Sequence, residues 1–328
     1  MEVCGTHTVS IFRYGIRSLL PDHIRLISGP GCPVCVTPNR DIDLAIALIR
    51  QRDVLLTTFG DMMRVPGSTS SLQKEKADGR EIRVVYSSLD ALSVARDNPE
   101  KKVIFFAIGF ETTTPTIAVA LLQARKEGLR NLYFLDSQKR VPPAMHALLQ
   151  TKQVKIDGFL LPGHVSAIIG KAPYQFLSKD HGLPGVITGF EPLDILQGVL
   201  MLVKQIEQGR SAIETQYRRV VHDEGNPVAR AKIDQVFQHD RGHWRGLGEI
   251  PDSGYRFRPP FEAMDARTLE ADVEPSREHP ECLCGEIIKG TRTPPECSLF
   301  KVLCHPENPI GPCMVSVEGT CCAYYKYH

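Results

Sequence analysis

The ten cysteines of this 328-residue chain stand only at its two ends. Three precede residue 36, seven follow residue 281, and none lies between. A secreted disulfide scaffold is normally short and exported, but residues 1–4 lack the basic start and the apolar stretch of a signal peptide. In a reducing compartment, clustered thiols more often bind metal or exchange electrons than crosslink a fold. We therefore predict a cytoplasmic protein whose chemistry lies at the chain ends, rather than scattered cysteines that act as small buried hydrophobes.

The charge balance excludes two classes of partner. The chain has 39 basic and 38 acidic side chains, so its net charge is 39 − 38 = +1. Nucleic acids and anionic membrane surfaces are bound by clustered Lys and Arg, and a transmembrane helix needs about 20 consecutive apolar residues. The sequence has neither feature, so we expect no nucleic-acid partner and no membrane partner.

A strand–turn–helix pattern repeats from residue 1 to about residue 208 and predicts an α/β fold. The expected strands share a short apolar or β-branched run: 1–4, 24–28, 54–58, 82–86, 103–108, 132–135, 158–161 and 186–188. The expected helices lie between or after them, several with proline at the first turn: 41–52, 89–96, 115–127, 142–151 and 192–208. Four strands precede residue 95 and four follow it. We therefore predict two similar lobes with parallel sheets flanked by helices, over residues 1–95 and 96–208, and a small Cys-rich C-terminal domain over residues 209–328.

One tripeptide occurs twice in the second predicted lobe. Gly109-Phe110-Glu111 and Gly189-Phe190-Glu191 each follow an apolar run and each precede a helix that begins with proline. The repeat is short, so it says nothing about how the two lobes are related.

The sequence Cys32-Pro33-Val34-Cys35 follows a predicted strand. A CxxC pair at the start of a helix favours the thiolate, which lowers the thiol pKa. Three interpretations stay open here: a redox dithiol, two ligands of a metal, or two structural thiols. A second CxxC at zinc-ribbon spacing is absent, which weakens the zinc interpretation.

Cys4 and His7 lie in the sequence Cys-Gly-Thr-His-Thr at the end of another predicted strand. Because ligands bind outside the carboxyl ends of parallel strands, we expect Cys4, His7 and the Cys32/Cys35 pair to converge there. Thiolates and an imidazole suit a transition metal such as iron. The alternative is a helix cap with an incidental Cys and His. Asp61 follows the next strand, and it either joins this crevice or is a surface carboxylate.

In the second predicted lobe, Glu111 begins the sequence Glu-Thr-Thr-Thr-Pro-Thr, and His164 follows Leu161-Pro162-Gly163. The threonines suit a helix cap. A carboxylate would repel a bound phosphate, so Glu111 is expected to act as a proton acceptor or a hydrogen-bond anchor toward the other lobe. His164 is a candidate site residue by its place at a strand end. No Walker loop, GxGxxG sequence after a strand or GxSxG elbow is present, so nucleotide-dependent and hydrolase functions have little support.

Seven cysteines occur among dense turn formers after residue 281: Cys282, Cys284, Cys297, Cys304, Cys313, Cys321 and Cys322. Such a segment buries too little apolar surface to fold without a crosslink. Four thiolates satisfy either one zinc ion or one [4Fe–4S] cluster. A cluster with a neighbouring dithiol uses six of the seven, whereas a single zinc ion leaves three unexplained.

Four sequences in order together resemble the HypD family of [NiFe]-hydrogenase maturation proteins, over essentially the whole chain. They are Cys-Gly-Thr-His-Thr from residue 4, Gly-Pro-Gly-Cys-Pro-Val-Cys from residue 29, Gly-Phe-Glu-Thr-Thr-Thr-Pro-Thr from residue 109, and Gly-Pro-Cys-Met-Val-Ser-Val-Glu-Gly-Thr-Cys from residue 311. The resemblance implies a scaffold that works with the chaperone HypC while an iron ion acquires two cyanides and one carbon monoxide. It also implies transient contact with HypE, which receives a carbamoyl group from HypF and supplies cyanide, and delivery of the iron to the hydrogenase large subunit. The activity that the resemblance implies is metallocentre assembly with a redox component rather than conventional enzyme turnover.

The same resemblance implies roles for single residues. Cys4 corresponds to the thiolate that shares the Fe(CN)2CO iron with a cysteine of HypC, and His7, Cys32 and Cys35 correspond to its supporting residues. The tail then holds a [4Fe–4S] cluster beside a dithiol, as in ferredoxin–thioredoxin reductase. The expected cluster ligands are Cys282, Cys297, Cys304 and Cys321. Cys284 and Cys313 are expected to form the dithiol that passes electrons toward Cys32/Cys35, and Cys322 is extra; partial exchange between these two sets stays open.

Family members usually have a leader of a few dozen residues before the Cys-Gly-Thr-His sequence, whereas only three residues precede Cys4 here. A mis-assigned start and an incomplete first strand are both open interpretations. Two other functions remain alternatives: a thiol–disulfide oxidoreductase that acts on a protein partner, and a zinc-stapled binding module without redox chemistry.

Overall fold

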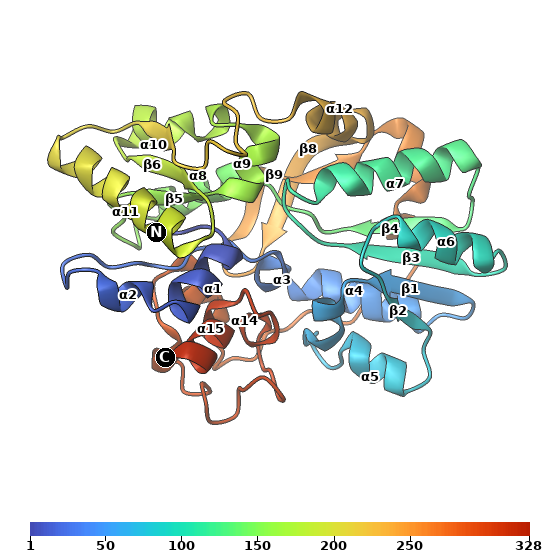
Figure 1. Cartoon of the computed structure of the whole chain (residues 1–328). Helices are drawn as coiled ribbons and strands as arrows, with labels where there is room; N and C mark the ends of the chain where they lie inside the picture. The colour runs from blue at the N-terminus through green and yellow to red at the C-terminus, as the bar shows by residue number, and fades with distance from the viewer.

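The computed structural model describes all 328 residues, and its larger sheet has four parallel strands in the order β2-β1-β3-β4. The strands are β1 (Val54–Thr58), β2 (Ile82–Val84), β3 (Lys102–Ala107) and β4 (Leu132–Asp136). Helices α4 (Asn39–Ile49) and α5 (Leu72–Ala77) lie on one side, and α6 (Asp90–Asp97) and α7 (Thr114–Glu127) lie on the other (Figure 1). All five residues of β1 are buried, as is usual where helices cover both faces of a parallel sheet.

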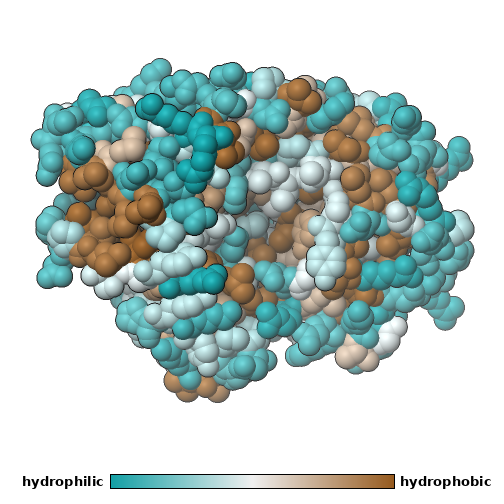
Figure 2. All heavy atoms as spheres, viewed as in Figure 1, coloured by the Kyte–Doolittle hydropathy of each residue, from teal (hydrophilic) through white to brown (hydrophobic).

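The smaller sheet has three parallel strands in the order β5-β6-β7. They are β5 (Phe159–Pro162), β6 (Gly185–Thr188) and β7 (Ile213–Thr215). Its helices are α8 (Val141–Thr151), α9 (Gly163–Ile169), η2 (Ala172–Tyr174), α10 (Gln175–His181) and α11 (Pro192–Glu207). Figure 2 shows apolar side chains on the surface over α11, where Leu193 and Leu200 are 72% and 52% exposed.

The α/β class with parallel sheets is confirmed, but the strands are divided between the two sheets differently from the expectation. The predicted strands 1–4 and 24–28 form only single bridges, in which Glu2 pairs with Ser28 and with Leu160 of the smaller sheet. Strand β3 pairs directly with β1, so the expected boundary between residues 95 and 96 falls within the larger sheet. The expectation of four strands on each side was wrong because pairing follows the crossover connections rather than equal division of the chain.

The segment after residue 208 also contributes to the α/β body. Beyond β7, helix α12 (Pro227–Val236) leads into an antiparallel hairpin of β8 (Phe237–Trp244) and β9 (Gly248–Phe257). Phe237 and Phe257 belong to the core under α7, because they are direct partners across the β8–β9 pair and opposite residues of an antiparallel pair point to the same face. The sequence pattern did not predict this hairpin.

The rest of the tail is a Cys-rich region of short helices below the sheets (Figure 1). It contains α13 (Cys284–Lys289), η5 (Pro294–Glu296), α14 (Pro312–Val315) and α15 (Thr320–Tyr327), after η3 (Pro259–Met264) and η4 (Ala266–Thr268). Helix α15 packs on α1 (Gly5–Arg13) near the N-terminus, which places the two cysteine-bearing ends of the chain together. The remaining short helices are α2 (Ile16–Leu19), α3 (Pro33–Val36) and η1 (Gly60–Arg64). None of the helices combines the length and the apolar character that crossing a bilayer requires.

Candidate functional site

The loop before Cys32 packs against the backbone of Cys4. The Gly5 N–H donates a hydrogen bond to the Gly31 carbonyl oxygen at 2.8 Å. A Cβ at Gly31 would lie 2.5 Å from the Cys4 Cα, a distance that real side chains do not tolerate, so only glycine fits. The first two cysteine motifs therefore lie side by side, with the Gly31 backbone against the Cys4 backbone.

Cys32 and Cys35 form a close buried pair. Their Sγ atoms are 2.6 Å apart, and the Cys32 Sγ accepts the Cys35 N–H at the start of α3. The expected low thiol pKa is wrong for Cys35, because burial and neighbouring thiols raise its pKa well above the usual value. Helix α3 has only four residues, so its dipole is too small to offset that burial.

A third thiol joins this pair from the other end of the chain. Cys313 is close enough to Cys35 to raise the pKa of the Cys35 thiol through a side-chain hydrogen bond. A small cavity is lined by Cys32, Cys35 and Cys313 together. The Cys284 thiol in turn donates to the Cys313 Sγ at 2.9 Å. A continuous series of sulfur contacts thus runs from Cys32 to Cys284.

Six tail cysteines surround a second cavity: Cys282, Cys284, Cys297, Cys304, Cys313 and Cys321. The other lining residues are glycine and apolar side chains, with no charged group among them. No three Cys, His, Asp or Glu side chains of the chain converge closely enough to hold a single metal ion. Thiols spread around an apolar cavity fit a larger inorganic group of the iron–sulfur kind better than one zinc ion. Cys322 does not line this cavity.

Cys4 is the N-cap residue of α1 and is buried. Burial, together with the nearby Glu318 carboxylate, raises the pKa of its thiol to about 12. Thr6 donates to the Glu318 Oε1 at 2.7 Å, and burial raises the pKa of Glu318. Sequence reasoning did not select Glu318, although it lies within the last quoted motif. Asp61, half-exposed in η1, lies close enough to raise the pKa of Glu318.

His7 faces the smaller sheet rather than the sulfur atoms. Its Nε2 lies 2.9 Å from the Gly189 carbonyl oxygen and 3.0 Å from the Thr188 Oγ1. Burial lowers the pKa of His7 to about 4, so the ring is neutral at pH 7. Phe190 stacks on His7 at a ring-centroid distance of 4.8 Å and on the exposed His164 at 3.9 Å. His7 thus anchors the helix that Cys4 caps, and Phe190 lies against both His7 and His164.

Glu111 lines a different cavity, together with Arg140, His239 and Tyr255. Its Oε1 accepts the Val141 N–H at 3.0 Å, where α8 begins. Burial raises the pKa of Glu111 to about 7. This contact lies within the second predicted lobe rather than toward the other lobe, and Glu111 does not join Cys4 and the Cys32/Cys35 pair.

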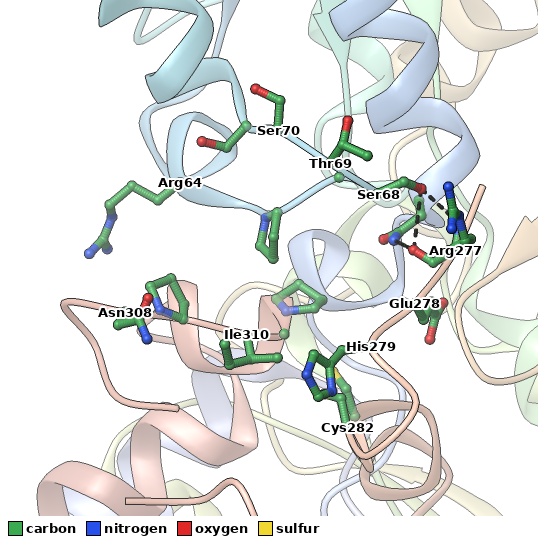
Figure 3. A pocket seen from close by; sticks show the side chains of 18 of the residues that line it. Arg64, Ser68, Thr69, Ser70, Arg277, Glu278, His279, Cys282, Asn308 and Ile310 are labelled. Carbon is green, nitrogen blue, oxygen red and sulfur yellow. Dashed lines mark hydrogen bonds between the residues drawn. The ribbon is translucent and has the colours of Figure 1, made fainter. Parts of the chain in front are cut away.

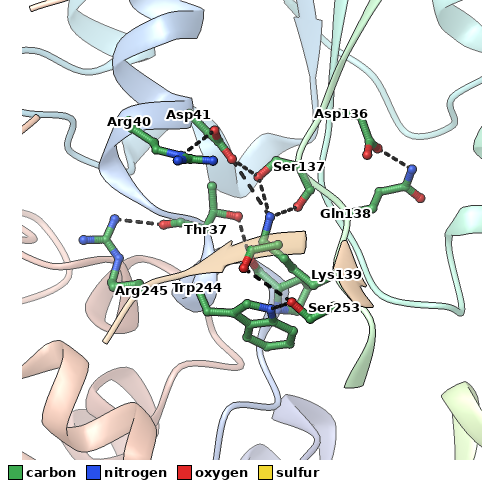
Figure 4. Close-up of polar contacts among 12 residues, drawn as sticks. Thr37, Arg40, Asp41, Asp136, Ser137, Gln138, Lys139, Trp244, Arg245 and Ser253 are labelled. Carbon is green, nitrogen blue, oxygen red and sulfur yellow. Dashed lines mark hydrogen bonds and ion pairs between the residues drawn. The ribbon is translucent and has the colours of Figure 1, made fainter. Parts of the chain in front are cut away.

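The segment after Cys35 is held by the tip of the β8–β9 hairpin, as Figure 4 shows. The Arg245 N–H donates to the Val36 carbonyl oxygen at 2.9 Å, and its Nη2 donates to the Thr37 carbonyl oxygen at 2.9 Å. Beside it, the Trp244 Nε1 donates to the Ser253 Oγ at 2.8 Å. The hairpin that the sequence did not predict therefore positions the dithiol loop.

A buried lysine lies near this loop, between the end of β4 and the start of α8. The Lys139 Nζ donates to the Ser137 carbonyl oxygen at 3.0 Å and lies 4.0 Å from the Asp41 Oδ2 (Figure 4). Burial lowers the pKa of Lys139, while the pKa of Asp41 is also lowered, by Arg267 and Lys139 against the effect of its own burial. Because Lys139 is buried and its ammonium group is held by Ser137 and Asp41, we interpret this group as structural.

Comparison with known proteins assigns the whole chain to one group. The family model described as HypD, "Hydrogenase formation hypA family", matches residues 1–328. The chain is 47% identical over 337 residues to the hydrogenase maturation factor HypD2 of Bradyrhizobium diazoefficiens. It is 49% identical over 336 residues to the hydrogenase maturation factor HypD of Rhodobacter capsulatus, and 46% identical over 332 residues to that of Escherichia coli strain K12. Each alignment covers all of this chain and 88% of the relative.

Proposed function

Because this chain belongs to the HypD family of hydrogenase maturation factors, we propose that it is the scaffold on which, with HypC, an iron ion acquires two cyanides and one carbon monoxide. In this proposal the iron is the substrate, HypE contacts the scaffold transiently, and the hydrogenase large subunit receives the product. The work takes place in the cytoplasm.

The observation that carries the proposal is the series of sulfur contacts between the two ends of the chain. The Cys284/Cys313 pair lies between the tail cavity and the Cys32/Cys35 pair, with 2.9 Å between the Cys284 and Cys313 Sγ atoms. Thiol–disulfide exchange needs direct contact between sulfur atoms, and Cys313 contacts Cys35 of the loop pair as well as its own partner Cys284. Two reducing equivalents can thus pass from the tail to the loop that packs on Cys4.

The tail cavity supports a resident [4Fe–4S] cluster. Cys282, Cys297, Cys304 and Cys321 would hold it, which leaves Cys284 and Cys313 free as the dithiol. Such a cluster supplies electrons one at a time. The apolar side chains around the cavity exclude water from the thiolates, and the dithiol stores the electrons as a pair.

Cys4 is the proposed iron ligand from this chain. Burial raises the pKa of its thiol to about 12, so iron binding would displace the thiol proton. Glu318, whose pKa is raised by burial, lies beside Thr6 and can take up that proton. His7 is neutral and transfers no proton in this proposal. It orients α1 through its contacts with Thr188 and Gly189.

Infrared spectroscopy of the anaerobically purified complex with HypC tests this function. Serine at Cys4, Cys32 or Cys35 should remove the iron-cyanide bands, because each change breaks the iron site or its electron supply. C322S is the matched control, since Cys322 is equally buried but lies outside the tail cavity, and it should keep the bands. Bands that survive all three site substitutions would refute the proposal.

The same sulfur series favours one other function, a thiol–disulfide oxidoreductase that acts on a protein partner. That function predicts reduction of a disulfide substrate without HypC and without any iron-cyanide bands. A third function, a zinc-stapled binding module, predicts a colourless protein with one zinc ion. Metal analysis and the visible spectrum of the protein purified without oxygen separate these functions.

A further inference from the structure

The tip of the β8–β9 hairpin, residues 245–247, lies beside the cysteine region. Arg245 at this tip is only 4% exposed, although a guanidinium group is rarely buried unless it is paired. Its Nη1 lies 2.9 Å from the Glu278 Oε1, and its Nη2 donates to the Asn39 Oδ1 at 2.5 Å and to the Thr37 carbonyl oxygen at 2.9 Å. The guanidinium therefore joins the loop after the first cysteine pair to the segment that leads into the tail cavity.

The same residue completes the end of helix α3. A helix end leaves carbonyl oxygens without partners inside the helix, and α3 ends at Val36. The Arg245 N–H donates to the Val36 carbonyl oxygen at 2.9 Å, and the side chain donates to that of Thr37 (Figure 4). Val36 and Thr37 are both fully buried, so no water replaces these donors. The position of Cys35 in this four-residue helix therefore depends on the hairpin tip.

Gly246 brings the hairpin tip onto the tail. A Cβ at Gly246 would lie 2.6 Å from the Cα and from the carbonyl oxygen of Gly285, the residue after Cys284. The two backbones are thus in direct contact. Gly248 has the same φ of +76°, but nothing lies within 4 Å of the place where its Cβ would stand. Of these two glycines, only Gly246 is therefore required by packing against the tail.

The hairpin tip is also close to the sulfur atoms of the tail. Arg245 lines a polar cavity of about 760 Å³ together with Cys282 and Cys284. Figure 3 shows Glu278 and Cys282 of this cavity on the same stretch of chain. The ion pair between Arg245 and Glu278 therefore holds the segment that enters the cysteine region.

Helix α3 also packs directly on α13 and α14. These three helices have only four to six residues each, and helices this short are not stable through their own hydrogen bonds. Contacts from outside the helices are therefore needed to fix how they meet.

We propose that Arg245 and Gly246 are positioning residues for thiol–disulfide exchange between the two cysteine pairs. Arg245 fixes the helix that carries Cys35, and Gly246 fixes the helix that carries Cys284. The inference rests on the proposed function, since it names the residues that align the electron route of that function.

The exchange itself balances within the chain. The Cys313 thiol loses its proton, and the thiolate attacks the Cys35 Sγ of the oxidised loop pair. The Cys32–Cys35 bond breaks, the Cys313–Cys35 bond forms, and Cys32 takes up one proton. The Cys284 thiolate, which has lost its own proton, then attacks Cys313, and Cys35 leaves and takes up the second proton. The loop pair thus gains two electrons and two protons, and the tail pair becomes a disulfide.

Thiol trapping of the anaerobically purified full chain tests the inference. Diamide first forms both disulfides, an excess of dithionite is then added, and samples are quenched with acid and alkylated at intervals. Peptide mass spectrometry gives the free-thiol fractions of Cys313 and Cys35 separately. In wild type, the Cys35 thiol should appear closely after the Cys313 thiol.

G246A should separate the two rates. Cys313 should be reduced within about twofold of the wild-type rate, whereas the Cys35 thiol should appear at least about tenfold more slowly, because a displacement of about 1 Å between reacting atoms costs up to about 10²-fold in rate. A general loss of folded structure would change both rates. The ratio of the two rates therefore reports on positioning.

G248A is the matched control, since it places a Cβ at the same φ without reaching Gly285. Both of its rates should stay within about twofold of wild type, because no neighbour has to move. R245K is a second test variant that adds no backbone strain. It keeps the charge but loses the forked donors, so it should slow Cys35 as G246A does, and it decides alone if G246A does not fold. A wild-type Cys35 rate in either folded variant, or equal slowing in G246A and G248A, overturns the inference.

C284S separates this inference from the proposed function. Without Cys284 the mixed Cys313–Cys35 disulfide is not resolved, so the Cys35 thiol should appear only at the rate of direct reduction by dithionite. Equal Cys35 rates in C284S and wild type contradict the electron route of the proposed function. Slowing in C284S with wild-type rates in G246A and R245K contradicts the positioning role alone.

Discussion

The tripeptide Gly-Phe-Glu follows strand β3 and also follows strand β6, yet its side chains make different contacts at the two places. Phe110 is buried and stacks on Trp244 of the hairpin, with ring centroids 5.9 Å apart. Phe190 is half-exposed and lies between His7 and His164. The first turn therefore fastens the hairpin, and the second supports the helix that Cys4 caps.

The two glutamates differ in the same sense. Glu111 is 2% exposed and accepts the N–H of Val141, thirty residues away in the sequence. Glu191 is exposed and forms a capping box with Asp194 at the start of its own helix, α11. Identical local sequence thus stands in the same strand–turn–helix order, although α7 begins three residues after Glu111 and α11 begins directly after Glu191. The contacts of each side chain are decided by the segments around it.

Both glycines are required, for different reasons. Gly109 has φ = +150°, in the region that side chains rarely adopt. A Cβ at Gly189 would instead collide with the Asp194 carboxylate. Glycine is required at position 109 by the backbone conformation and at position 189 by the nearby capping side chain.

The largest difference is expected between alanine substitutions at the two phenylalanines. F110A should lower the free energy of unfolding by about 4 kcal/mol, because it opens a cavity against a buried tryptophan. F190A should cost about 2 kcal/mol, since solvent already reaches part of that ring. Denaturant titrations of both variants measure these values. Equal losses would show that the two turns are equivalent in packing.

The second largest effect is on pH dependence. The folded pKa of Glu111, about 7, lies above its ordinary value of 4.5, so the folded state binds the proton more tightly. The contribution of this group to the free energy of unfolding is fully present below about pH 4.5 and is lost as the pH rises through 7. The total loss is about 3 kcal/mol. E111Q should remove this loss.

The measurement compares the free energy of unfolding of wild type and E111Q from pH 5 to pH 8. As the pH rises, the free energy of unfolding of E111Q should increase relative to that of wild type. E191Q is the matched substitution at the exposed turn, and its free energy of unfolding should change with pH as that of wild type does. Parallel curves for E111Q as well would mean that the Glu111 carboxyl is not buried in the folded protein.

A smaller effect is expected from E191A. Loss of the acceptor for the first-turn N–H of α11 should cost about 1 kcal/mol. E191Q, which keeps a side-chain oxygen, should recover most of that loss. A cost for E191A as large as that for F110A would contradict a purely local role of Glu191.

The smallest effect is expected from H164A. His164 is exposed and contacts the turn only through Phe190, so its removal should cost about 0.5–1 kcal/mol. Thermal unfolding of H164A and of F190A/H164A measures the coupling. Strict additivity in the double variant would indicate that the stacking contact contributes nothing.

Much of the site could be predicted because cysteine and glycine patterns are local. The sequence indicated that Cys4 and the Cys32/Cys35 pair end neighbouring segments, and Gly31 against Cys4 is the contact that this requires. The pattern did not reveal that Glu111 belongs to another cavity, because its partner Val141 is not recognisable from residues 109–116. Glu318 was missed for the same reason, since nothing local links it to Thr6.

The amino-acid sequence by itself determined the α/β class, the positions of the main helices, the separation of the cysteines into two terminal groups and the family. Hydrophobic periodicity, proline at helix starts and short motifs act within a few residues, so they can be read along the chain. Only the tertiary structure decided which strands share a sheet, which hairpin holds the loop after Cys35, and that Cys313 contacts Cys35. Those contacts join residues between 82 − 56 = 26 positions apart, for Leu56 and Ile82, and 313 − 35 = 278 positions apart, for Cys35 and Cys313. They depend on burial and packing that no local pattern encodes.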